Sequence, residues 1–143
     1  GFPSNAQENA AKMLNRLHDK VKDEDLIDYE CYECEDAEFI FLAFGSTSRS
    51  AIAGVKQLRE EGYKVGLFRP ITLWPAPQEA IRELANRVKG ICVAEMNMGQ
   101  YVLEVERLVC GKTQVSHMGR ANGEILLPGE FVDKAKEFFN EQK

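Results

Sequence analysis

The chain has 143 residues, which is enough for one domain built around a single hydrophobic core. Apolar residues make up 44% of it and charged residues 29%, as in a folded globular domain rather than a disordered chain. Eighteen basic and twenty-three acidic side chains leave a net charge of −5, which argues against nucleic acid as a partner. No apolar run approaches the roughly 18 residues of a membrane helix, so we expect no membrane association.

Residues 1–35 are predicted to be a connector that precedes the main domain. The chain starts at Gly1 rather than Met, so we expect either a processed protein or, as the preferred interpretation, a piece of a longer one. Ser4 and Gln7 fit a capping box at the start of a helix. The apolar face of this helix comprises Ala10, Met13, Leu14, Leu17 and Val21. Residues 26–34 alternate weakly and are a candidate edge strand.

Residues 36–143 are predicted to form one α/β domain, because strand and helix patterns alternate four times. The strands are expected at residues 39–44, 63–68, 91–94 and 113–117. Helical apolar spacing follows each strand, and the first three helices are expected to end at Gly62, Gly90 and Gly111. Three prolines in residues 69–77 predict irregular structure there. Right-handed crossovers then give a parallel sheet with helices on both faces.

The four cysteines indicate a reducing, cytoplasmic environment. Cys31 and Cys34 form a CxxC pair, but no second pair stands at zinc-ligand spacing. Acidic residues surround the pair and would raise a thiol pKa rather than lower it. Structural thiols are the simpler interpretation, and a redox role of Cys31 and Cys34 is the alternative.

The most suggestive polar residues follow the expected strands, where ligands gather in open α/β sheets. The candidate anion-binding or interface residues are Ser46, Thr47, Ser48, Arg49, Arg69, Asn97, Gln100 and Arg120. The turn from Gly45 to Arg49 places hydroxyl and backbone N–H groups at a helix N-terminus, which favours anions. The simpler interpretation is that Thr47 or Ser48 only caps that helix.

No pattern in the sequence predicts a catalytic or metal-binding residue. Glu95 could act as a general acid or base, but a lone carboxylate there more often accepts backbone N–H bonds. His117 has no carboxylate close to it in the sequence, and Met96 and Met98 are expected to fill the edge of the core. Neither histidine belongs to a recognisable catalytic triad.

Several longer strings carry a family resemblance. They are FGSTSRSA, LREEGYKVGLFRPITLWPAP, VAEMNMGQYVLEVER and GRANGEILLPGEF. Over residues 36–131 the chain resembles the alpha subunit of 2-oxoacid:ferredoxin oxidoreductases, and the 2-oxoglutarate type in particular. The opening GFPSN and the helix after it resemble the connector that precedes this domain in the family.

The resemblance implies a fold like the C-terminal domain of transketolase. That fold is a three-layer α/β/α sandwich with a mostly parallel, roughly five-stranded sheet that has one antiparallel strand. The candidate strand at residues 26–34 could supply the fifth strand, and the sequence leaves open which strand runs backwards.

The resemblance also implies a function for the assembled complex: the conversion of a 2-oxoacid and CoA to acyl-CoA, CO2 and reduced ferredoxin. Thiamine diphosphate, Mg and iron–sulfur clusters are expected in that complex and none of them in this fragment. The implied partners are the other domains of the alpha subunit and a beta subunit, with ferredoxin and CoA at the level of the complex. The leading hypothesis is therefore a non-catalytic domain that serves assembly and subunit contacts. The alternative is an anion- or CoA-binding module that uses the Gly45–Arg49 turn with Arg69 and Arg120.

Overall fold

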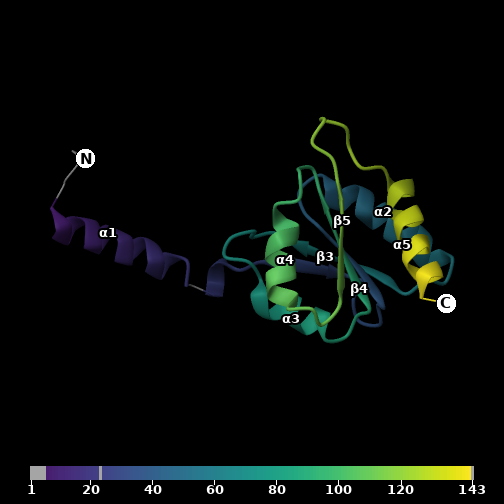
Figure 1. The fold of residues 1–143 in the computed structure, drawn as a ribbon, viewed down its shortest axis with the longest axis horizontal. Coiled ribbons are helices and arrows are strands. Elements are labelled where there is room, and N and C mark those ends of the chain that lie inside the picture. Colours follow the sequence, from purple (N-terminus) through teal and green to yellow (C-terminus); the bar gives the residue numbers. More distant parts are fainter. Residues whose placement is uncertain (1–5, 23, 143) are drawn as a thin grey trace.

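The computed structural model describes residues 6–22 and 24–142, whose body is a five-stranded sheet between two layers of helices (Figure 1). The strands are β1 (Tyr29–Tyr32), β2 (Phe39–Ala43), β3 (Val65–Pro70), β4 (Gly90–Glu95) and β5 (Gln114–Gly119). The helices are α1 (Gln7–Lys20), the 3-10 turn η1 (Glu24–Leu26), α2 (Thr47–Glu60), α3 (Gln78–Ala85), α4 (Tyr101–Val109) and α5 (Pro128–Glu141). The three layers confirm the expected fold class.

The sheet has the order β1-β3-β2-β4-β5, and β1 is its antiparallel strand. The other neighbouring strands pair in parallel, as the repeated strand and helix pattern predicts. β1 comes from the candidate edge strand in the connector, so the connector supplies the fifth strand of the sheet. The fold therefore also identifies the strand that runs backwards.

Alternating side chains of the central strands build one apolar core on each face of the sheet. Ile40, Leu42, Ile91 and Val93 pack toward α3 and α4. Phe39, Phe41, Cys92 and Ala94 pack toward α2 and α5. All five residues of β2 are buried, because β2 lies inside the sheet with a helical layer on either side (Figure 1).

Two expected boundaries are wrong. The second strand is expected to end at residue 68, but β3 continues to Pro70. A proline is tolerated there because the pairing with β2 already ends at Phe68 and only β1 lies beside Pro70, so its missing N–H group breaks no bond to β2. The helix expected to close at Gly90 ends at Ala85, and Gly90 is the first residue of β4. Glycine is required there by packing, since an added Cβ would lie 2.6 Å from the Phe138 ring.

The helix of the connector forms as predicted but stands apart from the body. α1 has no buried residue, and it projects away from the sheet (Figure 1). Its apolar face, with Met13, Leu14 and Leu17, is more than half exposed. The expected capping residue Ser4 and the GFPSN segment lie outside the described residues.

Candidate functional site

The chain reverses its winding direction between β2 and β4. The connection after β2 leads to β3 on one side, while the connection after β4 leads to β5 on the other. Ligands of open α/β sheets bind at the carboxyl ends of two such strands. The loops after β2 and β4 are therefore the first place to look for a site.

A cavity of about 450 Å³ opens at this point, and we call it the aromatic hollow. Its lining residues are Phe44, Leu73, Trp74, Glu95, Asn97, Gln100, Tyr101 and Glu104. The rings of Phe44 and Tyr101 meet edge to face with centroids 5.4 Å apart, and Trp74 stands at the mouth with 70% of its surface exposed. The Tyr101 hydroxyl is shielded from water and has no hydrogen-bond partner among the described residues. Burial raises the pKa of Tyr101 to about 12, so this group stays neutral at physiological pH.

Glu95 is fully buried at the end of β4 and holds the start of α4. Its Oε2 accepts hydrogen bonds from the Tyr101 backbone N–H at 2.9 Å and from Asn97 Nδ2 at 2.8 Å. Its Oε1 accepts one from the Val102 backbone N–H at 3.0 Å. Both oxygens are thus used as acceptors at a helix N-terminus, where a negative charge is favourable. The interpretation of Glu95 as a backbone-binding carboxylate is confirmed.

The structure brings His117 to Glu95, although the two residues are far apart in the sequence. His117 Nε2 lies 3.6 Å from Glu95 Oε1, because β5 runs beside β4. An added Cβ on Gly119 would lie 2.6 Å from that ring nitrogen, so glycine leaves room for the imidazole. Sequence reasoning missed this pair, and the only available signal was the expected adjacency of the two strands.

Asn97 and Gln100 both line the aromatic hollow, but Asn97 is used by its own loop. The Asn97 Oδ1 accepts hydrogen bonds from the backbone N–H groups of Gly99 at 2.8 Å and Gln100 at 3.0 Å. Met96 is half-buried against the core as expected. Met98, by contrast, is 86% exposed, so its expected place in the core is wrong. Met98 lies within the turn that these Asn97 hydrogen bonds close, and its side chain faces solvent.

The Gly45–Arg49 turn does not cap α2 with a hydroxyl group. The Ser48 Oγ donates to the Gly45 carbonyl at 2.7 Å, and no side chain caps the N-terminus of α2. Thr47 and Ser48 are buried, whereas Ser46 and Arg49 are exposed. The expected cap by Thr47 or Ser48 is therefore wrong, because this serine hydroxyl satisfies a carbonyl instead.

The three candidate arginines do not meet in one site. Arg49 lines a hollow of about 250 Å³ with Ser46 and Thr47, whereas Arg69 lines a different one of about 300 Å³. Arg69 binds Glu30 across the β1–β3 pair at 2.9 Å.

Arg120, the third of these arginines, forms ion pairs with Glu130 and, at 3.5 Å, with Glu124. Two of the three cations are thus neutralised by carboxylates of this chain. This arrangement disfavours the alternative of a single anion- or CoA-binding module.

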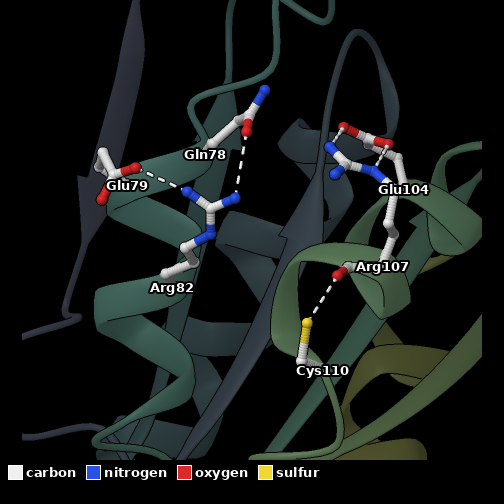
Figure 2. Close-up of polar contacts among 6 residues, drawn as sticks. All are labelled: Gln78, Glu79, Arg82, Glu104, Arg107 and Cys110. Atoms are coloured by element: carbon white, nitrogen blue, oxygen red, sulfur yellow. Dashed lines mark hydrogen bonds and ion pairs between the residues drawn. The ribbon is translucent and has the colours of Figure 1, made fainter.

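Ion pairs lie on the surfaces of α3 and α4 (Figure 2), and one of them includes Glu104, which lines the aromatic hollow. Arg107 binds Glu104 through two hydrogen bonds of 2.6 and 2.8 Å, and it holds the pKa of that carboxyl below its usual range. On α3, Arg82 reaches Glu79 at 2.6 Å and Gln78 at 3.3 Å. Of these ion-paired residues only Glu104 lines the hollow, so this carboxylate, paired with Arg107, forms the charged border of an otherwise mainly apolar cavity.

Two of the four cysteines, Cys34 and Cys92, are buried as structural thiols would be. All four are free, and only Cys31 and Cys110 are exposed. The Cys34 Sγ donates to the Leu67 carbonyl at 3.1 Å, and burial, with the neighbouring Cys31, raises the pKa of its thiol to about 12. Burial likewise raises the pKa of Cys92 to about 11. The Cys34 thiol is thus held in the interior by its hydrogen bond to Leu67, as a structural thiol would be.

The residues present do not fit the cofactors that the resemblance implies. An iron–sulfur cluster needs four thiolates, and Cys92 lies in the core on a different strand from the CxxC pair. Within residues 6–22 and 24–142, no group of three or more His, Cys, Asp or Glu side chains is arranged to hold a metal ion. In the same part of the chain, no helix is long and apolar enough to cross a membrane.

Comparison with known proteins identifies the family. Residues 37–131 match the family model of the pyruvate:ferredoxin oxidoreductase core domain II. The 2-oxoglutarate synthase subunit KorA of Methanothermobacter marburgensis is 34% identical over 94% of this chain and 36% of its own length. The ketoisovalerate oxidoreductase subunit VorB of the same organism is 37% identical over 83% of this chain and 34% of its own length. The chain thus spans about a third of the length of these relatives.

Solved structures share the fold. The 2-oxoglutarate:ferredoxin oxidoreductase from Magnetococcus marinus, solved with 2-oxoglutarate, coenzyme A and succinyl-CoA bound, superposes with a TM-score of 0.70. It is 22% identical, and the match covers 96% of this chain and 24% of that one. A split-gene transketolase matches 76% of this chain and 40% of its own, with a TM-score of 0.65 and 19% identity. With the family model covering most of the sheet and its helices, the chain belongs to the pyruvate:ferredoxin oxidoreductase core domain II family.

Proposed function

We propose that this chain is a domain of the alpha subunit of a 2-oxoacid:ferredoxin oxidoreductase, and that the domain serves assembly rather than chemistry. The observation that carries the proposal is the family match over residues 37–131, extended by 34% identity to a 2-oxoglutarate synthase subunit over 94% of the chain. The assembled enzyme would convert a 2-oxoacid and CoA to acyl-CoA, CO2 and reduced ferredoxin in the cytoplasm.

The internal use of the polar groups supports a non-catalytic role. Glu95 and Asn97 bind the β4–α4 loop, while Arg69 and Arg120 bind carboxylates of this chain. Groups that are already satisfied gain little by binding a substrate or cofactor. Thiamine diphosphate with Mg and the iron–sulfur clusters would be held by other parts of the complex, which would include a beta subunit. The exposed Arg49 and Gln100 suit contacts with those other parts.

2-Oxoglutarate is the proposed substrate of the complex. Relatives with this substrate in their names match the chain over more than nine-tenths of its length. Two relatives with other oxoacids in their names match less of the chain, each at 37% identity. The ketoisovalerate oxidoreductase subunit VorB matches 83% of it, and a pyruvate synthase subunit PorA of Pyrococcus abyssi matches 67%. The substrate assay therefore needs all three oxoacids.

The test is an anaerobic assay of the complete subunit, expressed with its neighbouring subunit genes. We expect CoA-dependent reduction of a viologen dye by 2-oxoglutarate, with samples lacking CoA or oxoacid as controls. Activity with pyruvate or 2-ketoisovalerate alone would keep the family and correct the substrate. If a complex shown to contain its clusters and thiamine were inactive with every oxoacid, the proposed function would be rejected.

A further inference from the structure

The aromatic hollow lies within a larger apolar surface at the carboxyl edge of the sheet. Besides Trp74, the loop after β3 exposes Ile71 and Leu73, and the loop after β4 exposes Met98. The described surface of this domain thus exposes a tryptophan at the aromatic hollow, and a methionine on the loop that contributes Asn97 and Gln100 to the same lining. Exposed apolar surface of this kind marks an interaction site.

The composition of the surface is that of a protein interface rather than of a polar ligand site. Tryptophan is the residue most enriched among those that dominate binding energy at interfaces. The charged groups nearest the hollow are already satisfied: Glu95 by N–H donors and Glu104 by Arg107. An apolar centre with a charged border matches the anatomy of protein interfaces. The matching partner is therefore a polypeptide segment with a bulky apolar side chain that enters the hollow.

The relatives indicate where that segment comes from. In the KorA and VorB subunits, a region like this chain makes up about a third of one polypeptide. A segment on the same polypeptide can reach an effective concentration in the millimolar range, which favours it over a second copy or a separate subunit of equal intrinsic affinity. We propose that the aromatic hollow docks this domain onto the remaining two-thirds of its own polypeptide, through an apolar side chain packed between Phe44, Trp74 and Tyr101. The proposal rests on the proposed function only in assigning the chain to such a subunit.

The direct test is photo-crosslinking in the complete subunit, assembled with its partner subunits. The photoreactive amino acid p-benzoyl-phenylalanine replaces Trp74, and in a control it replaces Leu103, which is 64% exposed on α4 but does not line the hollow. Mixing isotopically heavy and light copies before irradiation distinguishes bonds within one polypeptide from bonds between two copies. We expect position 74 to crosslink within the same copy of the complete subunit, to a peptide that lies outside the 143 residues of this chain. Crosslinks only to another copy or another subunit, or none at all, would overturn the proposal.

A second measurement does not depend on the photoreactive group. Trp74→Ser should accelerate proteolytic release of this domain from the complete subunit by about tenfold or more, because an undocked domain exposes its linker. Leu103→Ser should leave the rate unchanged, and Met98→Ser tests the same surface without changing an aromatic wall. Equal rates for Trp74→Ser and the parent would also overturn the proposal. Neither crosslinking nor proteolysis depends on enzyme turnover. A subunit that crosslinks as expected but reduces no dye would therefore contradict the proposed function and leave the docking proposal standing.

Discussion

Glu95 is the residue on which three elements of the carboxyl edge depend. It belongs to β4, its oxygens accept the first N–H groups of α4, and His117 of β5 lies 3.6 Å away. A fully buried carboxylate is stable only when such donors surround it. Because both of its oxygens are already used by donors of this chain, Glu95 is suited to a structural role.

Replacing Glu95 by Gln should destabilise the fold by about 1–3 kcal/mol. The amide removes the negative charge at the N-terminus of α4 and turns an N–H group toward donors that need an acceptor. Urea unfolding of the chain, followed by circular dichroism, measures the change. Glu83→Gln, on the exposed side of α3, is the matched control and should be neutral. Equal midpoints for Glu95→Gln and the parent would show that the network contributes nothing to stability.

At the scale of elements, sequence patterns located the buried strands well and the exposed one poorly. β2 and β4 are apolar on both faces, which only a strand between two helical layers tolerates. All four residues of β1 are exposed, so their apolar alternation is weak, and pairing with β3 defines the strand instead. Boundaries such as Pro70 and Gly90 depend on which neighbour lies beside the residue, and local patterns do not contain that information.

β1 and α1 precede residue 36 in the connector, yet the structure assigns them different roles. β1 pairs with β3 over four residues, and Tyr29 stacks on Phe68 at 5.0 Å. Arg59 of α2 also donates to the Glu33 carbonyl at 2.6 Å. α1 has no buried residue, so its contacts add little to the body. We propose that the folding unit begins between α1 and β1 rather than at residue 36.

Two truncations test this boundary. A chain that starts at residue 24 should unfold within about 0.5 kcal/mol of the parent, because the α1 helix that it lacks has no buried residue. A chain that starts at residue 36 should lose about 2–4 kcal/mol, since the cross-strand pairs disappear and the edge of β3 opens to water. Urea unfolding compares the two, with the complete chain as reference. Equal stability of both truncations would place β1 outside the folding unit.

At the scale of the molecule, sequence patterns predicted which polar residues lie at the carboxyl edge of the sheet, but not which of them are paired with other residues of the chain. Parallel strands must place Arg49, Arg69 and Asn97 at one edge, and they do. Their long-range partners decide what they can bind, and these partners lie elsewhere in the sequence: Glu30 holds Arg69, and Glu130 holds Arg120. The hollow itself was not predictable, because Trp74 comes to it from the loop after β3 and Tyr101 from the start of α4.

The pairing of these arginines within the chain also predicts that this chain alone does not bind thiamine diphosphate. Two of the three candidate arginines, Arg69 and Arg120, are paired with carboxylates of this chain and are not free to hold a diphosphate. Isothermal titration of the 143-residue chain with thiamine diphosphate and Mg²⁺ should show no saturable binding tighter than about 1 mM. The complete complex, titrated with the same solution, is the positive control. Tight, stoichiometric binding to this chain would mean that the domain contains a cofactor site, and the assignment of the chemistry to other parts of the complex would then be wrong.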